Sequence, residues 1–326
     1  MAMNRILVIG AAGMLGRKLL QKLAQDASLG ASQITHATLH DIVAPQPPSH
    51  AAFQARSVAS DLSLAGEADK LVAERPSVIF HLAAIVSGEA EADFEKGYRV
   101  NLEGTRQLFE AIRKVGAGYR PRVVFSSSIA VFGAPFPEAI DDEFVSAPLT
   151  SYGTQKAMAE LLLSDYTRRG FLDGIGIRLP TVCVRPGKPN RAASGFFSGI
   201  IREPLNGQQA VLPVSEDVRH WHASPRAAVG FLLHAAALPG ERIGPRRNLT
   251  MPGLSVTVAE QIAALRRVAG DAPARLIRRE PDPAIMGIVK GWPENFDARR
   301  ARELGFQADA SFEEIIRIYI EEELKA

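Results

Sequence analysis

The stretch Arg5-Ile6-Leu7-Val8-Ile9-Gly10-Ala11-Ala12-Gly13-Met14-Leu15-Gly16 decides how the chain folds. It begins with a short apolar run, which is typical of a buried strand in a parallel sheet. Glycines follow at every third position, and the leucines after them repeat with the period of a helix. Glycines between a strand and a helix permit a tight turn and let backbone N–H groups approach a pyrophosphate. Although the more common spacing is Gly-x-Gly-x-x-Gly, this order of strand, loop and helix predicts a dinucleotide-binding unit.

A second expected strand, residues 37–40, ends at Asp41. An acid roughly 20 residues beyond the glycines typically accepts hydrogen bonds from the adenosine ribose. Asp41 lies slightly further on, which a loop over residues 27–33 explains. Its carboxylate would repel a 2′-phosphate, so we expect NAD rather than NADP, with Arg17 beside the loop as the one feature that favours NADP.

Strand and helix patterns alternate along the first half of the chain. Such alternation indicates an α/β protein with a doubly wound, Rossmann-type parallel sheet. The expected strands are residues 6–9, 37–40, 56–58, 78–82, 122–126 and 175–178, and the expected helices fill much of 15–25, 64–74, 94–115 and 152–169.

After Pro180 the pattern changes, because prolines and glycines interrupt short segments. We expect a smaller C-terminal mixed α/β lobe that binds substrate, comprising residues 186–224 and 250–326. The NAD-binding domain would comprise residues 1–185 together with 225–249, where a helix at 225–238 returns to the main sheet.

Tyr152 and Lys156 stand four residues apart, so both fall on one face of a helix. An ammonium group near a phenol favours the phenolate and lowers the pKa of the tyrosine. A serine run lies upstream, and the Ser128 hydroxyl would hold a substrate hydroxyl against the phenol. The three residues predict a proton-transfer site, although the Tyr-x-x-x-Lys spacing alone also fits a surface pair on a helix.

The composition fits an enzyme with a large core: 326 residues, 46% of them hydrophobic, suffice for one or two domains. A net charge of +2 with dispersed cations gives no reason to expect nucleic acid. One cysteine, Cys183, excludes an intramolecular disulfide, and His220 and His222 have no third ligand in register, so we expect no metal. We expect a cytoplasmic protein, because the chain enters a strand at once and has no apolar stretch of membrane-spanning length.

In these motifs the chain resembles the extended short-chain dehydrogenases/reductases, the NAD-dependent epimerase/dehydratase family. The matching segments come in the family's order: 10–16, 61–62, 81–84, 101–105, 125–133, 152–156 and 178–181. The resemblance implies that Ser128, Tyr152 and Lys156 are catalytic and that Ser126 and Ser127 are more structural. It also implies NAD as the cofactor, contacted by Gly10, Ala12, Gly13, Met14, Leu15, Gly16, Asp41, Asp61, Leu62, Leu82, Ala83, Ala84, Asn101, Ser126, Tyr152, Lys156 and Pro180.

Within the family, further segments are similar to the D-erythronate dehydrogenases, namely 83–94, 178–187, 199–207, 280–285 and 291–293. This likeness implies that the C2 hydroxyl of a small sugar acid is oxidised to a 2-keto acid. The substrate end also departs from the epimerases. Thr181 stands where they carry an asparagine, and His220 stands where they carry an aspartate. Both departures weaken the nucleotide-sugar interpretation without excluding it.

A small acidic substrate needs a cation and short hydroxyl-bearing side chains. We expect Arg219 to bind the carboxylate, with Arg185 in reserve if Arg219 turns outward; the alternative for Arg219 is a structural salt bridge. Ser87 is a further candidate, and its alternative is a helix N-cap. The complete expected substrate set is Ser87, Ser128, Tyr152, Thr181, Asn190 and Arg219.

Three functions therefore remain open: a sugar-acid dehydrogenase that consumes NAD, a nucleotide-sugar epimerase or dehydratase that retains it, and a non-catalytic NAD-binding regulator. The family resemblance also implies a homodimer through a four-helix interface of residues 94–115 and 152–169. The side chains expected across it, unless they serve the monomer core, are Leu108, Phe109, Ile112, Leu161, Leu162 and Leu163.

Overall fold

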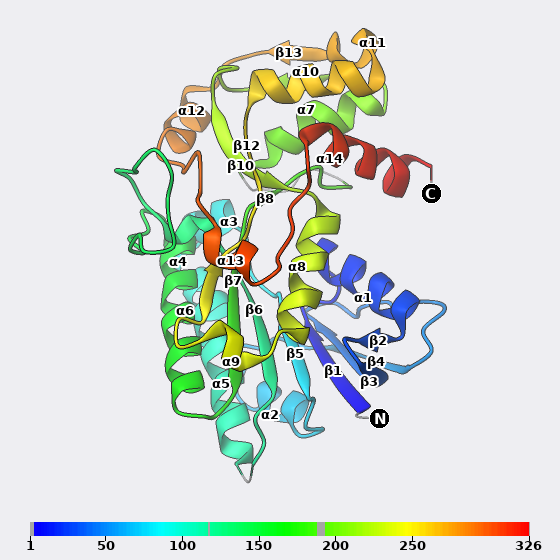
Figure 1. Cartoon of the computed structure of the whole chain (residues 1–326), viewed down its shortest axis with the longest axis vertical. Coiled ribbons are helices and arrows are strands. Elements are labelled where there is room, and N and C mark those ends of the chain that lie inside the picture. Colours follow the sequence, from blue (N-terminus) through cyan, green and yellow to red (C-terminus); the bar gives the residue numbers. More distant parts are fainter. Residues whose placement is uncertain (1–2, 117, 188–192, 326) are drawn as a thin grey trace.

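The main sheet of the protein is parallel, apart from one short edge strand (Figure 1). The computed structural model describes residues 3–116, 118–187 and 193–325. The strands of this sheet lie in the order β11 (Asn248–Thr250), β7 (Asp173–Leu179), β6 (Arg122–Ser128), β5 (Val78–His81), β1 (Met3–Ile9), β3 (Ser32–Asp41) and β2 (Ser28–Leu29), with β4 (Gln54–Ala59) also paired to β3. The predicted Rossmann-type sheet is confirmed. The two strands that the sequence did not predict, β2 and β11, are short and lie at the edges.

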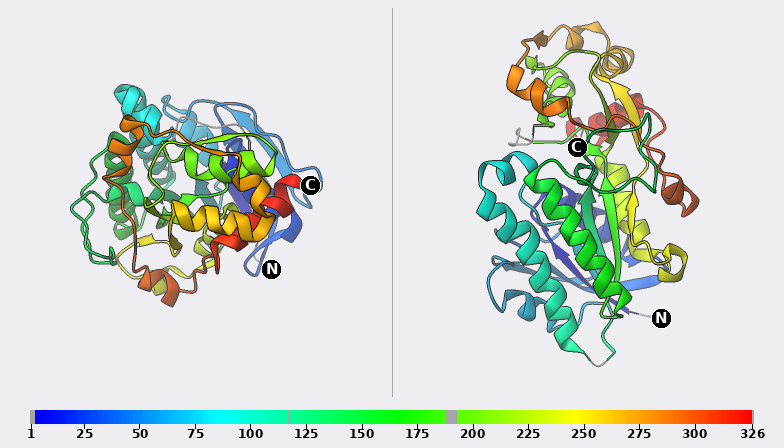
Figure 2. Two further views of the ribbon diagram at one scale, coloured as in Figure 1. Left: turned by 90° about the horizontal axis from the view of Figure 1, so that it is seen from above. Right: turned by 90° about the vertical axis from the view of Figure 1, so that its left-hand side faces the viewer.

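Helices cover both faces of this sheet, as its sequence pattern requires (Figures 1 and 2). In β1, Ile6 and Val8 pack against α1 (Met14–Asp26) and α8 (Pro225–Ala237). Leu7 and Ile9 point to the opposite face, because successive strand side chains alternate. They pack with α2 (Glu67–Val72), α5 (Gly104–Val115) and α6 (Ser151–Arg168). The N-terminal strand is therefore buried on both faces.

The helix predicted over residues 94–115 is not uniform. It consists of α4 (Phe94–Gly97), the π-helical turn η1 (Tyr98–Glu103) and α5. Asn101 lies buried in this turn, where its side-chain amide donates to Gln155 of α6 at 2.8 Å. The same side chain accepts the backbone N–H of Ile85 at 2.9 Å. Asn101 therefore ties the turn to α6 and to the loop after β5.

A separate lobe with its own core lies above the carboxyl ends of the main strands (Figure 1). Its three-stranded sheet has the order β12 (Leu254–Thr257), β10 (Arg219–Ala223), β8 (Thr181–Val182), and β13 (Ile277–Arg279) pairs with β9 (Ala210–Leu212). Its helical elements are α7 (Gly195–Leu205), α10 (Val258–Ala269), α11 (Asp271–Ala274), α12 (Pro283–Val289), α14 (Phe312–Tyr319) and η3 (Ile320–Leu324).

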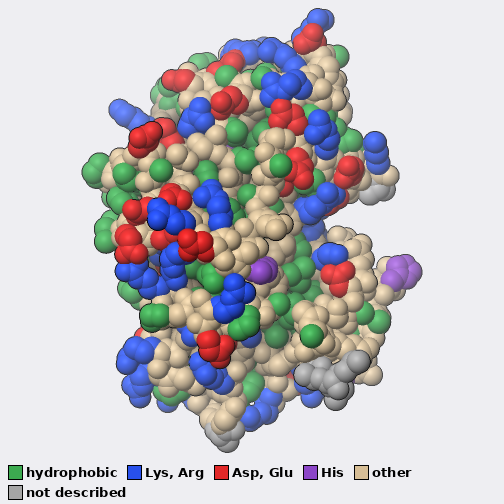
Figure 3. Space-filling model, in the orientation of Figure 1, with side chains coloured by type: hydrophobic (Ala, Val, Ile, Leu, Met, Phe, Trp, Pro, Cys, Tyr) green, Lys and Arg blue, Asp and Glu red, His purple; other side chains and the backbone are tan. Residues whose placement is uncertain are grey.

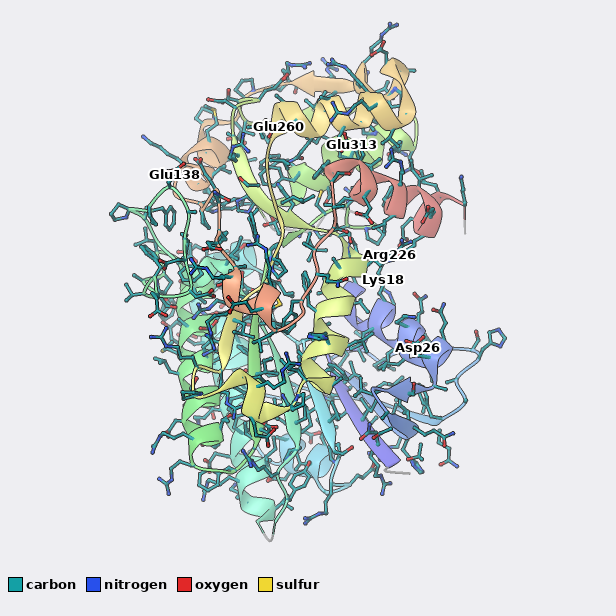
Figure 4. All side chains as sticks on the ribbon, in the orientation of Figure 1. Lys18, Asp26, Glu138, Arg226, Glu260 and Glu313 are labelled. Carbon is teal, nitrogen blue, oxygen red and sulfur yellow. The ribbon has the colours of Figure 1, made fainter. Side chains whose placement is uncertain are left out.

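The boundary between the two parts differs from the expected one. Ala301 of α13 (Arg299–Glu303) and Phe306 belong to the core of the main sheet, although the sequence assigned both residues to the lobe. The chain also returns to the main body near its end. Lys18 of α1 pairs with Glu322 at 2.8 Å, and Arg226 of α8 pairs with the same carboxylate at 2.8 Å (Figure 4). Burial of apolar side chains, rather than chain order, sets the boundary.

Most residues expected across a dimer interface are instead part of the monomer core. Leu108, Phe109, Ile112 and Leu163 are fully buried beneath α5 and α6, because the sheet needs an apolar cover. Leu161 is 72% exposed and stays available to a partner. The homodimer itself stays a prediction.

Acidic and basic side chains are interspersed over the face drawn in Figure 3. This mixture agrees with the dispersed charges of the sequence, and many of the cations are paired with neighbouring carboxylates, for example Arg267 with Glu313. In the part of the chain that the structure describes, no helix is long and apolar enough to cross a membrane.

Candidate active site

A cavity of about 370 Å³ lies at the carboxyl ends of β1, β5 and β6, beneath the lobe. Ligands of open α/β sheets bind at this edge, because the loops after parallel strands gather there. One wall comes from the main sheet and α6, and the other from the lobe. Sheet-side residues include Gly10, Leu82, Ser87, Ser128 and Tyr152. Lobe-side residues include Thr181, Arg185, Ser194, His220, Trp292 and Pro293.

The glycine loop is packed so closely that side chains would not fit. Gly10 has a φ of +91°, and a Cβ there would lie 2.6 Å from the backbone nitrogen of Ala83. A Cβ on Gly16 would lie 2.2 Å from the Gly10 carbonyl oxygen. Among the described residues, no side chain caps the N-terminus of α1. The backbone N–H groups of residues 10–13 are already bonded to His40, Asp41 and the Gly10 carbonyl oxygen. The N–H groups at the start of α1, in residues 14–16, lie beside the cavity and fit the pyrophosphate of a dinucleotide.

The expected cofactor residues divide into two groups. One group lines the cavity: Gly10, Gly13, Met14, Leu15, Gly16, Leu82, Ala84, Ser126, Tyr152, Lys156 and Pro180. The other group lies outside the cavity lining: Ala12, Asp41, Asp61, Leu62, Ala83 and Asn101. Ala83 still touches the loop through its close approach to Gly10.

Asp41 is held at the end of β3 by two backbone groups. One carboxylate oxygen accepts the N–H of Ala12 at 2.9 Å, and the other accepts the N–H of Ile42 at 2.7 Å. Asp61 is paired with Arg99 at 2.6 Å and accepts the N–H of Ser63 at 2.9 Å. Each carboxylate oxygen has two lone pairs, so Asp41 keeps acceptor capacity beside the glycine loop.

The start of α6 brings Tyr152 to the end of β6. The Thr150 hydroxyl caps the helix by accepting the N–H of Gly153 at 3.1 Å. Gly153 permits close packing, since a Cβ there would lie 2.1 Å from the Ala130 carbonyl oxygen. Ser128 ends β6 and accepts the N–H of Ala130 at 3.1 Å. Ser128 and Tyr152 both line the cavity, so the structure brings the predicted pair together.

Lys156 lies one turn further along α6 and is 2% exposed. Its Nζ donates to the Ser126 carbonyl oxygen at 2.8 Å and lies 4.7 Å from the Phe125 ring centroid. Glu160, a further turn along, is buried between Arg178 and Ser127, with an Nη2–Oε2 distance of 2.7 Å and an Oγ–Oε1 distance of 2.5 Å. The lysine is therefore held by its hydrogen bond to the Ser126 carbonyl oxygen, while the Glu160 carboxylate is bound by other partners.

The pKa values of this pair correct one expectation. Burial raises the pKa of Tyr152 to about 12, and its hydrogen bond with Ser128 offsets only part of that rise. Burial also lowers the pKa of Lys156 to about 7, against the attraction of Glu160. In the chain alone, Lys156 therefore does not lower the pKa of Tyr152. Its Nζ lies 5.7 Å from the Tyr152 ring centroid, and its own charge is weakened by desolvation.

Arg219 does not line the cavity, which corrects the expected carboxylate site. Its Nη1 donates to the Ser255 carbonyl oxygen at 2.9 Å and lies 3.3 Å from Glu260. Because strand side chains alternate, Arg219 and His220 of β10 point to opposite faces. His220 faces the cavity and Arg219 faces β12. The salt-bridge alternative for Arg219 is the one that the structure supports.

Arg185 is the cation in the lobe-side wall. It lines the cavity, and its Nη2 donates to the Ser194 hydroxyl at 3.0 Å. Desolvation lowers its pKa. Among residues 3–116, 118–187 and 193–325, no carboxylate forms a salt bridge with Arg185, whereas Arg202 nearby is paired with Glu203 at 2.5 Å. Arg185 therefore presents a partly buried positive charge to whatever occupies the cavity.

The structure places only some of the other expected substrate residues at the cavity. Ser87 and Thr181 line the cavity. Ser87 is the first residue of α3 (Ser87–Ala92), whose N-cap is Val86, so the N-cap alternative for Ser87 is not supported. Asn190 lies outside the described residues.

The lining residues that were not predicted include His220, Trp292 and Pro293. The Thr181 hydroxyl lies 2.7 Å from Nε2 of His220, and Nδ1 of His220 lies 2.9 Å from the Pro293 carbonyl oxygen. Burial lowers the pKa of His220 to about 4. The alternation of His220 and His222 around Trp221 indicated a strand but not which face meets the cavity.

No group of three or more potential metal ligands occurs within the described part of the chain. Cys183 is fully buried, and burial raises the pKa of its thiol to about 12. The site is therefore built from hydroxyls, a phenol, a lysine, an arginine and a histidine.

Comparison with known sequences relates this chain to enzymes. The NAD-dependent epimerase/dehydratase family matches residues 6–234. A D-erythronate dehydrogenase of Cupriavidus necator is 49% identical over 97% of this chain and 98% of its own length. A second D-erythronate dehydrogenase, from Haemophilus influenzae, is 42% identical over 97% of this chain and 99% of its own length.

Solved structures agree on the fold. A crystal structure described as the nucleoside-diphosphate-sugar epimerase from Agrobacterium tumefaciens is 64% identical, with a TM-score of 0.97 over 99% of this chain and 96% of that chain. The holo form of an L-threonine dehydrogenase from Cupriavidus necator has a TM-score of 0.84 at 23% identity over 97% of this chain and 99% of that chain. At that identity the likeness shows the fold alone.

Proposed function

The chain belongs to the NAD-dependent epimerase/dehydratase family and is an NAD-dependent oxidoreductase, and we propose that it oxidises the C2 hydroxyl of a small sugar acid. The best candidate substrate is D-erythronate, with 2-keto-D-erythronate as the product. The main support for this proposal is the position of Arg185, a cation that lines the same cavity as Ser128 and Tyr152.

Arg185 would bind the substrate carboxylate. A guanidinium that faces a carboxylate forms charge-assisted and often bidentate hydrogen bonds, which fix both distance and orientation. Fixing the carboxylate also places C2, the carbon next to it, relative to the sheet-side wall. Rigid placement matters because small displacements of a reacting atom cost much of the rate. Arg185 thus takes the role that the sequence assigned to Arg219.

Tyr152 would accept the proton of the C2 hydroxyl at its phenolic oxygen, while Ser128 holds that hydroxyl in place. Two electrons and the hydrogen on C2 leave as hydride, and C2 becomes a carbonyl carbon. The chemistry supplied by bound NAD⁺ is hydride acceptance, together with a positive charge that favours the phenolate. The cofactor would be held by the glycine loop, Asp41 and Lys156.

A second function has one observation in its favour. The Agrobacterium tumefaciens relative is described as a nucleoside-diphosphate-sugar epimerase, and it is 64% identical to this chain. An epimerase returns its hydride to the substrate in each turnover, so it forms no net NADH. The absence of the epimerase asparagine at Thr181 argues against this function.

Steady-state formation of NADH separates the two functions. Purified protein with NAD⁺ and D-erythronate should release NADH continuously, with L-threonate as the stereochemical control. A UDP-hexose should give neither NADH nor an epimer. Turnover of the UDP-hexose without net NADH, together with no oxidation of D-erythronate, would contradict the proposal.

A further inference from the structure

We propose that Thr181 and His220 form a fixed hydrogen-bond acceptor that selects a substrate hydroxyl at the lobe-side wall of the cavity. This inference rests on the proposed function and deepens it, because it assigns a specificity-determining role to Thr181 and a positioning role to His220. Three groups form a chain of hydrogen bonds: the Pro293 carbonyl, the His220 ring and the Thr181 hydroxyl.

The Pro293 carbonyl oxygen determines which ring nitrogen of His220 carries the proton. A carbonyl oxygen can only accept a hydrogen bond, so Nδ1, at 2.9 Å, must be the donor. The ring is 2% exposed and stacks on Phe197 with a centroid distance of 5.3 Å and an interplanar angle of 4°. An apolar environment of this kind disfavours the imidazolium, so the ring is neutral and has a single N–H.

The neutral ring in turn orients the Thr181 hydroxyl. Since Nδ1 carries the hydrogen, Nε2 is an acceptor, and Thr181 must donate to it across 2.7 Å. The hydroxyl has one hydrogen, and that hydrogen now points to His220. Toward the cavity, which Thr181 lines, the oxygen can offer only lone pairs.

The lobe-side wall therefore has two complementary ends. Arg185 offers N–H donors and positive charge, which suit a carboxylate. Thr181 offers an acceptor, which suits a hydroxyl and disfavours a carboxylate, because two acceptors cannot share a hydrogen bond. A site built to hydrogen-bond a substrate hydroxyl rejects the analogue that lacks it, since its polar group is left unpaired. Arg185 and Thr181 would together orient an acid that carries a hydroxyl at its other end. The hydroxyl bound by Thr181 would be a different one from the reacting hydroxyl at C2.

The test compares D-erythronate with its 3-deoxy and 4-deoxy analogues, each of which lacks one non-reacting hydroxyl. The wild-type protein should discriminate against one of the two by roughly 10- to 100-fold in kcat/KM. Thr181→Val keeps the shape and removes the oxygen, so most of that discrimination should disappear. Thr181→Ser keeps the hydroxyl and should retain it.

His220→Phe keeps an aromatic ring against Phe197 but removes Nε2, so Thr181 is no longer held as an acceptor. This variant should lose discrimination while Thr181 is intact, which a purely structural role for the histidine would not produce. Should it fail to fold, a long-range ¹H–¹⁵N spectrum of histidine-labelled wild-type protein identifies the tautomer directly, with His220 expected to carry its proton on Nδ1.

Two results would overturn this inference: a proton on Nε2 of His220, or equal discrimination by the wild type and Thr181→Val. A different result would contradict the proposed function itself. In that case the wild-type protein forms no NADH with D-erythronate, and the tautomer measurement still decides whether Thr181 is an acceptor.

Discussion

The two walls of the cavity differ in how their residues are spaced along the chain. The sheet-side wall is made of short contiguous motifs: the glycine loop at 10–16, the end of β6 at Ser128, and Tyr152 to Lys156 in one turn of α6. The lobe-side wall gathers Thr181, Arg185, His220 and Trp292, which are spread over 111 positions of the chain. The motifs of the first wall could be predicted from the sequence, whereas for the second wall only Thr181 and, in reserve, Arg185 were expected. We therefore expect the catalytic and cofactor contacts to come from local motifs, and the choice of substrate to depend on the tertiary arrangement of the lobe.

The largest effect should come from the sheet-side wall. Tyr152→Phe removes the proton acceptor, so kcat should fall on the order of 10²–10⁴-fold, while the affinity for NAD stays near that of the wild type. Because the pKa of Tyr152 lies above neutrality, the phenolate fraction and the wild-type oxidation rate should both rise with pH. Rate measurements over pH with NAD titrations check both points. Near-normal turnover by the variant would remove Tyr152 from the mechanism.

The next effect tests the lobe-side wall. Arg185→Ala should lower kcat/KM for D-erythronate by roughly 30-fold or more, since truncating one partner of a desolvated charge pair typically costs about 2–5 kcal/mol. The matched control is Arg219→Ala, which removes an arginine outside the cavity and should change kcat/KM by less than about twofold.

Erythritol, the uncharged alcohol of the same length, sharpens this comparison. The preference of the wild type for the acid over the alcohol should fall in Arg185→Ala and persist in Arg219→Ala. If the preference for the acid instead falls in Arg219→Ala and persists in Arg185→Ala, then Arg219 binds the carboxylate. That result would also show that the lobe moves when substrate binds.

A smaller effect is expected at the edge of the glycine loop. Asp41→Ser removes the negative charge that would repel a 2′-phosphate, so the ratio of kcat/KM for NAD to that for NADP should fall on the order of 10-fold. The ratio is the informative quantity, because the Ala12 N–H also loses its acceptor and both cofactors should bind less well. A wild-type preference for NADP would contradict this assignment of Asp41.

A last prediction concerns stability rather than activity and comes from Lys156. Its pKa is about 7 in the folded chain, below the ordinary value of 10.5, so the unfolded chain binds more protons between these values. The free energy of unfolding without cofactor should therefore rise with pH from about 7 to about 9, as the cost of a buried charge is relieved. Lys156→Met should be more stable near pH 7 and should flatten the rise, as urea denaturation across pH would show. Lys70→Met, at an exposed position, is the control and should keep the wild-type slope.

Much of the fold followed from the sequence because its signals are local. The apolar run of β1, the leucine period of α1 and the glycine loop each occupy fewer than about fifteen residues and predict an element without reference to the rest of the chain. The parallel sheet then follows, because alternating strands and helices pack in few ways. The edge strands β2 and β11 have two and three residues, too few to show any period.

The sequence by itself determined the dinucleotide-binding half of this protein and the identities of Ser128, Tyr152 and Lys156 as the candidate catalytic residues. Only the tertiary structure decided that Arg185 rather than Arg219 faces the cavity and that His220 orients Thr181. It also decided that burial, rather than the Lys156 ammonium group, sets the direction in which the pKa of Tyr152 shifts. The physical reason is the same in each case. Which face of a strand meets a cavity, and how dry a side chain becomes, depend on what packs against it from distant parts of the chain.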